Sequence, residues 1–347
     1  MRLMELMGTY ETRYILSYLR DPADIVRARG VCREWRALVA EPQINKYRLR
    51  DILAFEPYDI LYHACVANNI KLAKYAISRG ATNFNSCFYI ACQTGNKEAI
   101  LLMLEHGANN FNCGLCTKGM DGIEIAKLMI ARGATDFNSA LCEACDNGNI
   151  EMAKLMIAYG ATNFNESIVD ACKYGYYDIV KLLLAHGATD LNEGFVEACG
   201  GGHINIVKLL ISHGANNFDE GLKSACCSGR VDVAELMITS GATNLDDALM
   251  GACCMGHPAI IELLVARGAT ELNEALITAC VIGETRIVEL IVGYGANNLN
   301  VGLSKCCCDD KWWRAIQSIK YNDVIKLLIR LGATHCANCN KSASSYN

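Results

Sequence analysis

The sequence predicts an all-α protein, a solenoid of stacked helix–turn–helix units with a small helical segment in front of it. Three observations carry this prediction. A Gly-Ala pair returns at a nearly constant interval, two helix patterns alternate between successive pairs, and proline is scarce, with 4 residues in 347. Because neither helix of such a unit can bury its apolar stripe alone, the units must stack.

The Gly-Ala pair sets the period of the array. Successive glycines are 27 residues apart, except for one interval of 26 and a last interval of 37. A fixed interval over most of a chain is typical of one continuous array rather than of several ordinary domains. The glycines are Gly80, Gly107, Gly133, Gly160, Gly187, Gly214, Gly241, Gly268, Gly295 and Gly332.

Two columns of the repeat bound a short first helix. The first column holds only Asn or Asp, whose side chains accept hydrogen bonds from the amides of a helix's first turn, so it predicts N-caps. Ten residues later, a column of Gly, with Asn68 in the first unit, predicts left-handed C-caps. The columns are Asn85, Asn112, Asn138, Asn165, Asn192, Asp219, Asp246, Asn273 and Asn300, then Gly95, Gly122, Gly148, Gly175, Gly202, Gly229, Gly256 and Gly283.

A second helix follows each glycine of the C-cap column. Its apolar residues have the spacing of Ile179, Val180 and Leu183, which is typical of an amphipathic helix, and it ends at the next Gly-Ala. His106 and His186 stand just before a Gly-Ala, where they can interact with the last carbonyl groups of this helix. Each unit is therefore a helix, a turn, a helix and a loop.

Nine of the 20 cysteines fall in one column of the first helices. A free cysteine packs as a small hydrophobic residue. Stacked helices stand about 8–10 Å apart, which is too far for a ladder of bonded sulfurs. We predict that this column only packs between helices; it comprises Cys65, Cys92, Cys145, Cys172, Cys199, Cys226, Cys253, Cys280 and Cys307.

Composition limits the classes of partner and location. Hydrophobic residues make up 52% of the chain and charged residues 20%, which predicts a folded protein with a large core. Charged residues interrupt every apolar run and the chain start lacks a signal-peptide core, so we expect a soluble, cytoplasmic monomer with reduced thiols and no membrane contact. A net charge of −5 argues against nucleic acid as a partner.

Two units are irregular. In the third, Lys118 and Gly119 replace Ala-Cys and one residue is missing after Gly122. We predict a local kink or weak joint there; the alternative is a lysine that simply extends to water. The last unit contains the insertion DDKWWRAIQS, whose Trp312 and Trp313 would cap the end of the solenoid or anchor a partner.

The repeat resembles the ankyrin repeat over about residues 58–334. Ankyrin repeats have about 33 residues, and the T-P-L-H stretch with its preceding β-turn is missing here. The resemblance implies a protein-binding helical solenoid whose projecting fingers are shortened to bare loops. The matching residues of one unit are Ala198, Cys199, Gly202, His203, Ile206, Val207, Leu209, Leu210, Ile211, Gly214 and Ala215.

Residues 15–44, ILSYLRDPADIVRARGVCREWRALVAEPQI, differ from the repeats and resemble an F-box, although the usual Leu-Pro opening is absent. The resemblance implies an exposed apolar ridge that binds the Skp adaptor of a cullin-RING ubiquitin ligase. The alternative is a helical cap on the solenoid. Cys32 has no nearby histidine to activate it as a nucleophile. The adaptor-binding residues implied are Leu16, Leu19, Pro22, Ile25, Val26, Val31, Cys32, Trp35 and Leu38.

Positions that vary between units are free to recognise a target. One column places Glu143, Asp170 and Glu197 in consecutive units and predicts a negative stripe. Columns that are polar elsewhere become apolar in two later units and predict an exposed apolar patch beside it. The alternative is a solvated acidic face and buried apolar residues. The patch comprises Met250, Cys254, Met255, Ile277, Val281 and Ile282.

Motifs for catalysis and cofactor binding are missing from the sequence. It contains no phosphate-binding glycine loop, no zinc-protease motif and no nucleophile elbow, so we predict no catalytic residue, no cofactor and no enzyme activity. His335, Cys336 and Cys339 could join Cys306 or Cys308 around zinc, but a single C-x-x-C is weak support and we predict no metal site.

These observations predict a protein-interaction adaptor with an F-box-like segment at 1–50, about ten ankyrin-like repeats at 51–334 and a tail at 335–347. Its leading function is to link a target protein to a cullin-RING ligase. The alternative is an interaction scaffold without ligase coupling. The many short repeats behind an F-box resemble proteins encoded by large DNA viruses of protists, which implies action in the host cytoplasm.

Overall fold

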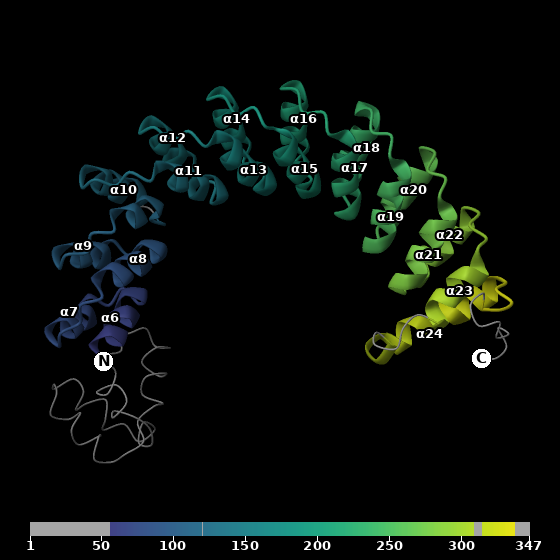
Figure 1. Cartoon of the computed structure of the whole chain (residues 1–347), viewed down its shortest axis with the longest axis horizontal. Coiled ribbons are helices and arrows are strands. Elements are labelled where there is room, and N and C mark those ends of the chain that lie inside the picture. The colour runs from purple at the N-terminus through teal and green to yellow at the C-terminus, as the bar shows by residue number, and fades with distance from the viewer. Residues whose placement is uncertain (1–55, 120, 309–313, 337–347) are drawn as a thin grey trace, which may run out of the picture. The chain divides into compact units, whose positions relative to one another are not determined.

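The computed structural model describes residues 56–119, 121–308 and 314–336, and there it forms a succession of paired helices (Figure 1). The predicted all-α solenoid is confirmed. The residues implied in adaptor binding, from Leu16 to Leu38, and Trp312, Trp313 and Cys339 lie outside the described residues.

Each repeat contributes a first and a second helix. The first helices are α6 (Pro57–Val66), α8 (Phe84–Thr94), α11 (Phe137–Asp146), α13 (Phe164–Tyr174), α15 (Asn192–Gly201), α17 (Phe218–Cys227), α19 (Leu245–Met255), α21 (Leu272–Ile282) and α23 (Leu299–Cys308), with the 3₁₀ helix η1 (Phe111–Cys116) in the third repeat. The second helices are α7 (Ile70–Ser78), α9 (Lys97–Glu105), α10 (Gly122–Ala131), α12 (Ile150–Ala158), α14 (Tyr177–Ala185), α16 (Ile204–Ser212), α18 (Val231–Ser240), α20 (Pro258–Ala266), α22 (Thr285–Gly293) and α24 (Arg314–Leu331).

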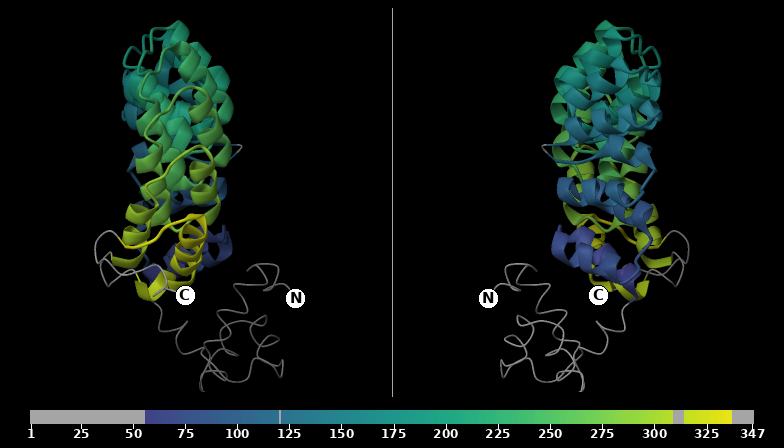
Figure 2. Two further views of the ribbon diagram at one scale, coloured as in Figure 1. Left: turned by 90° about the vertical axis from the view of Figure 1, so that its right-hand side faces the viewer. Right: turned by 90° about the vertical axis from the view of Figure 1, so that its left-hand side faces the viewer.

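The chain divides into two compact units. Unit 1 ends at Ala144 and also includes Glu151–Thr162, whereas unit 2 comprises Cys145–Ile150 and the chain from Asn163 onward. In unit 2, first helices pack on first helices in chain order from α13 to α23. The colours run from teal to yellow in the same order, so consecutive repeats are neighbours in space (Figure 2).

The loops that join one repeat to the next are short. Between a second helix and the following first helix they contain four to six residues, and every described element is a helix. These loops are therefore bare in the described part of the chain, without a projecting hairpin, as the sequence predicts.

The glycine column forms the predicted C-caps, with one exception. Gly175 ends α13 with φ 82°, and Asn68 takes the same left-handed conformation with φ 50°. Gly122 does not have this conformation, because it is the first residue of α10. In that repeat Gly119, with φ 92°, makes the left-handed turn instead. The C-cap prediction is thus wrong for Gly122 alone among these glycines.

The N-cap prediction for the Asn/Asp column is wrong. Helix α13 begins at Phe164, so Asn165 lies inside its first turn. The Asn165 Oδ1 atom accepts hydrogen bonds from the main-chain amides of Thr189, at 2.8 Å, and Asp190, at 3.2 Å. These amides belong to the loop of the next repeat, so the side chain joins two repeats rather than capping its own helix.

The same bond recurs along both units. Each acceptor side chain binds one or two main-chain amides that lie 23 to 35 residues further along the chain. We call this set the loop staples. The acceptors and their first amide partners are Asn85 with Asn109, Asn112 with Thr135, Asn138 with Thr162, Asn165 with Thr189, Asn192 with Asn216, Asp219 with Thr243, Asp246 with Thr270, Asn273 with Asn297 and Asn300 with Thr334.

A second set of bonds joins repeats at the other end of the first helices. The His203 Nε2 atom donates to the carbonyl oxygen of Lys173 at 3.1 Å, and His257 Nε2 donates to that of Cys227 at 3.1 Å. These carbonyls lie at or beside the end of a helix, where main-chain partners are lacking. Helices α13 and α17 are thereby held at both ends by the repeat that follows each of them.

The described cysteines of the column are buried and pack against small residues. A Cβ atom on Gly194 would lie 3.1 Å from the Cys172 Sγ atom, and one on Gly302 would lie 2.9 Å from Cys280 Sγ. At Cys172 and Cys280 the cysteine therefore occupies the space that a glycine in the next repeat leaves open. This confirms the packing role predicted for the column, except at Cys307, whose side chain lies outside the described set.

Burial keeps these thiols protonated. It raises the pKa of Cys172, Cys199, Cys226 and Cys253 to about 12 in each case, compared with the ordinary value of 9.0. A thiol is reactive only as the thiolate, so these cysteines are chemically inert at neutral pH.

The third repeat is irregular, and a weak joint there stays a prediction. Its first helix is the short η1, after which Thr117 is extended. The Lys118 amide donates to the carbonyl oxygen of Cys92 at 3.1 Å, so the main chain caps α8 here. The Lys118 side chain is half exposed and lies 3.8 Å from Glu143, so it does extend to water.

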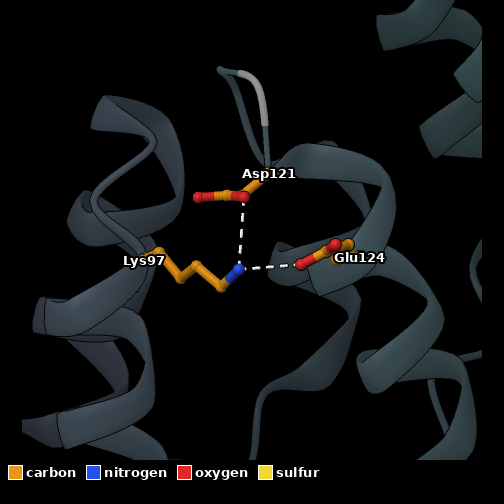
Figure 3. A network of polar contacts seen from close by, with 3 residues as sticks. All are labelled: Lys97, Asp121 and Glu124. Atoms are coloured by element: carbon orange, nitrogen blue, oxygen red, sulfur yellow. Dashed lines mark hydrogen bonds and ion pairs between the residues drawn. The ribbon is translucent and has the colours of Figure 1, made fainter.

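An ion-pair network joins this repeat to the one before it. Lys97 on α9 lies 2.7 Å from Glu124 and 3.2 Å from Asp121 (Figure 3). Both carboxylates lie at the start of α10, where the helix dipole stabilises negative charge. The hydrogen bonds that Lys97 donates to Glu124 and Asp121 raise its pKa.

Candidate protein-interaction surface

The first helices of unit 2 expose one face to solvent. On α19 this face consists of Asp247, Met250, Gly251, Cys254 and Met255, which are spaced at three- and four-residue intervals and therefore lie on one side of the helix. The opposite side of α19 contributes buried residues to the core. Because the first helices pack in chain order, the equivalent faces of α13 to α21 form one surface.

The acidic end of this surface lies on the first helical turns. Five consecutive repeats have an acid at the same position, and two of them have a second acid one turn later. We call these residues the acidic row; they are Glu166, Glu193, Glu220, Asp247 and Glu274, with Asp170 and Glu197 in the next turn.

Glu197 and Asp170 differ in their surroundings. Glu197 is exposed, whereas Asp170 is half-buried. Burial, together with the nearby carboxylate of Asp146, raises the pKa of Asp170. Glu143, the third residue of the predicted stripe, lies in unit 1 and pairs with Lys118. Asp170 and Glu197 lie on consecutive first helices of unit 2, and partner binding by the three residues stays a prediction.

Few cations balance the acidic row. The helices α13, α15, α17, α19 and α21 carry nine carboxylates and two lysines. Lys223 lies 2.9 Å from Asp247, and the Lys173 Nζ atom lies 5.3 Å from the centre of the Tyr174 ring. Two of the carboxylates, Asp219 and Asp246, serve as loop staples. The remaining surface keeps a strong negative charge.

The predicted apolar residues are partly or fully exposed. Met255 is 60% exposed and Val281 41%, and Cys254 is also exposed. Met250, Ile277 and Ile282 are half-buried. These six residues on α19 and α21 are called the apolar patch.

The apolar patch is continuous between its two helices. The Thr278 hydroxyl of α21 lies 3.6 Å from the Met250 sulfur of α19. On its other side, α19 packs against α17: a Cβ atom on Gly251 of α19 would lie 2.7 Å from the Cys227 Sγ atom of α17. The glycine lets α17 and α19 approach closely, so the patch on α19 lies beside a helix that carries Glu220 of the acidic row.

Metal ligands are not gathered at this surface. Within the residues that the structure describes, there is no group of three or more His, Cys, Asp or Glu side chains that could hold a metal ion. At the last repeat, His335 Nδ1 lies 3.0 Å from the Thr334 hydroxyl, and the Cys306 thiol contacts the Cys280 carbonyl oxygen at 3.6 Å. Across the same described parts, no helix is long and apolar enough to cross a membrane.

Sequence reasoning missed two features of this surface. The acid at Glu166, Glu193, Glu220, Asp247 and Glu274 recurs at the 27-residue period and could have been found from that period. The close approach at Gly251 has no comparable signature, because a glycine inside a helix does not reveal what lies beside it.

Comparisons with known proteins match two separate segments of the chain. A sequence model described as F-box-like matches residues 12–48. A model described as ankyrin repeats in three copies matches residues 115–194. A search of curated proteins gave no match. Among solved structures, the human ASB11 ankyrin repeat domain is 24% identical over 45% of this chain and 84% of that chain, with a TM-score of 0.40. Two separate segments are thus similar to known families, residues 12–48 to an F-box-like segment and residues 115–194 to ankyrin repeats.

Proposed function

We propose that this protein is a substrate receptor that links a target protein to a cullin-RING ubiquitin ligase. The observation that carries the proposal is the presence of the two matches in one chain, F-box-like at 12–48 and ankyrin repeats at 115–194. The first would bind a Skp-type adaptor and the second would hold the target. Both are interaction modules, so the contribution of this chain is proximity and orientation of the target.

The proposed adaptor contacts are the F-box-like residues Leu16, Leu19, Pro22, Ile25, Val26, Val31, Cys32, Trp35 and Leu38. The proposed target contacts are the acidic row and the apolar patch of unit 2, together with Glu143, Trp312 and Trp313. A monomer in the cytoplasm, or in the host cytoplasm if the protein is viral, remains the predicted state.

Retention of a Skp-type adaptor tests the proposal. Tagged full-length protein is expected to co-purify with the adaptor, and Trp35→Ala combined with Leu38→Ala is expected to abolish this. Arg36→Ala lies between the two positions but outside the V-C-R-x-W-x-x-L pattern, so it is the matched control and should retain the adaptor.

A scaffold without ligase coupling is the second candidate function. It would follow if wild-type protein retained no adaptor, because residues 1–50 would then serve only as a helical cap. Proximity labelling with the Trp35→Ala, Leu38→Ala chain separates target from ligase. Bound targets should still be labelled by this variant, whereas ligase subunits should no longer be labelled.

A further inference from the structure

The apolar patch on α19 and α21 is accessible from solvent. Met255 and Val281 are among the most exposed large apolar side chains of the described residues, at 60% and 41%. Contiguous apolar surface of this kind marks sites of protein association. The patch also lies on rigid helices whose opposite sides are fully buried, so it is presented in a fixed geometry.

The charge beside the patch identifies the chemistry of the partner. Within the described residues, Glu166, Glu193 and Glu197 form no ion pair, whereas both lysines of these helices already contact Asp247 or Tyr174. The neighbouring helices α13 and α15 therefore offer carboxylates that lack a cation. Lysine and arginine side chains complement such a surface, and like charges would be repelled from it.

We propose that unit 2 binds a protein segment that has apolar side chains at one end and lysine or arginine side chains at the other. This inference rests on the proposed receptor function and names the class of target. The apolar end contacts the apolar patch on α19 and α21, and the basic end contacts the acidic row on α13, α15 and α17.

The spacing of the helices sets the length of this segment. Packed helices stand about 8–10 Å apart, so the five helices from α13 to α21 span roughly 40 Å. An extended chain rises about 3.3 Å per residue, so at least about 12 residues are needed to contact both ends. Buried apolar anchors would supply most of the affinity, and the carboxylates would speed association and set its orientation.

A peptide selection tests this proposal. A phage-displayed library of random peptides of about 16 residues, long enough for that span, is selected on immobilised full-length protein. Enriched peptides are expected to combine an apolar cluster with several lysines or arginines. Their affinity, measured by fluorescence anisotropy, should fall as salt is raised, because screening weakens exposed charge pairs.

Variants of the full-length chain locate the binding site. Glu193→Lys with Glu197→Lys on α15 should weaken the selected peptides about tenfold or more, as expected for charge reversal at an interface. Met255→Ser with Val281→Ser should have an effect of similar size. Asp178→Lys with Asp232→Lys makes the same charge change on the exposed second helices α14 and α18, and this matched control should leave affinity within about twofold.

Several results would overturn the proposal. One is a selection that enriches no peptides on wild type beyond those enriched on the Glu193→Lys, Glu197→Lys variant. Another is enrichment of peptides that lack lysine and arginine. A third is equal affinity of the selected peptides for wild type and for this variant. Competition by a synthetic peptide of residues 10–45 would show that the chain's own N-terminal segment is the occupant. A dimer by light scattering that the Met255→Ser, Val281→Ser variant dissociates would show a second copy there. If the wild-type chain bound the selected peptides but retained no adaptor, the receptor function would be refuted and this site would stand.

Discussion

The third repeat and the fifth repeat use the same plan with different chemistry. In residues 160–186, Ala171 and Cys172 are buried in the last turn of a full α-helix that ends at the left-handed Gly175. In residues 107–132, Lys118 and Gly119 occupy the equivalent positions, and the helix is reduced to η1. A charged side chain cannot be buried there without a partner, so the helix ends before it and the lysine faces water.

The array nevertheless continues through the third repeat. Asn112 still staples the following loop through the amides of Thr135 and Asp136, and the main-chain amide of Lys118 caps α8. A Cβ atom on Gly95 would lie 2.4 Å from the Lys118 carbonyl oxygen, so the glycine column is what lets the chain pass so closely. The comparison teaches that contacts between repeats are retained even where the helix within a repeat is lost.

Alkaline pH should destabilise the regular repeats more than any single substitution, because the loss of stability adds up over several buried thiols. Burial raises the pKa of Cys92, Cys172, Cys199, Cys226 and Cys253 to about 12, from an ordinary value of 9.0. Between these values the folded chain holds more protons than the unfolded chain, so stability is full below pH 9 and falls as pH rises toward 12. Urea midpoints followed by circular dichroism should be constant from pH 7 to 8 and fall steeply above 9.

Tyrosine and lysine also titrate in this range, so a control is needed. The chain with Cys172→Ala, Cys199→Ala and Cys226→Ala should show a shallower fall than wild type. Equal slopes would mean that the thiols do not contribute to the pH dependence.

The next largest effect on stability should come from placing a lysine in the fifth repeat at a buried position, as the third repeat has in its sequence. Cys172→Lys places a charge at a buried position with no acid prepared for it, which should lower the free energy of unfolding by at least about 3 kcal/mol. Glu166→Lys on the same helix is exposed and should change it by less than about 0.5 kcal/mol. Urea unfolding measures both, and similar midpoints for the two variants would contradict the prediction.

Two glycines, one in the C-cap column and one inside a second helix, should respond to alanine with opposite changes in stability. Gly175→Ala should destabilise by more than about 1 kcal/mol, because φ is 82° and the new Cβ would lie 2.5 Å from the His203 ring. Gly293→Ala is in α22 with nothing within 4 Å, so it should stabilise by about 0.5–1 kcal/mol. Melting temperatures that move in the same direction for both variants would refute this account.

Removing one loop staple should have the smallest effect. Asn165→Ala removes the oxygen that accepts hydrogen bonds from the exposed amides of Thr189 and Asp190. This should lower the free energy of unfolding by about 1 kcal/mol. Asn205→Ala on α16 is also an exposed asparagine and should be nearly neutral. Hydrogen exchange at Thr189 and Asp190 should accelerate in Asn165→Ala only; unchanged exchange would show that the staple does not hold the loop.

The fold was predictable because its determinants are periodic. The Gly-Ala pairs, the left-handed glycines and the apolar stripes each recur every 27 residues, and the structure confirms the helices they indicate. The break at Lys118 was also predictable, since a charge in a buried column conflicts with its environment.

The role of the Asn/Asp column was not predictable in the same way. An asparagine near a helix start can accept from its own first turn or from a neighbouring loop, and sequence spacing describes only the first possibility. The C-cap at Gly122 failed because the missing residue in that repeat shifted the turn to Gly119. At the candidate surface, exposure of Met255 and Val281 followed from the variable columns, whereas the close approach at Gly251 depends on packing between helices.

The loop staples have a consequence for how such a chain can change over generations. Each regular staple joins an acceptor to an amide 24 residues ahead, so it depends on the next 27-residue segment having the same plan and not on which segment that is. Duplication or loss of a whole segment by unequal recombination would preserve every remaining staple. The array can therefore lengthen, shorten or exchange recognition residues in single genetic steps while each product remains foldable.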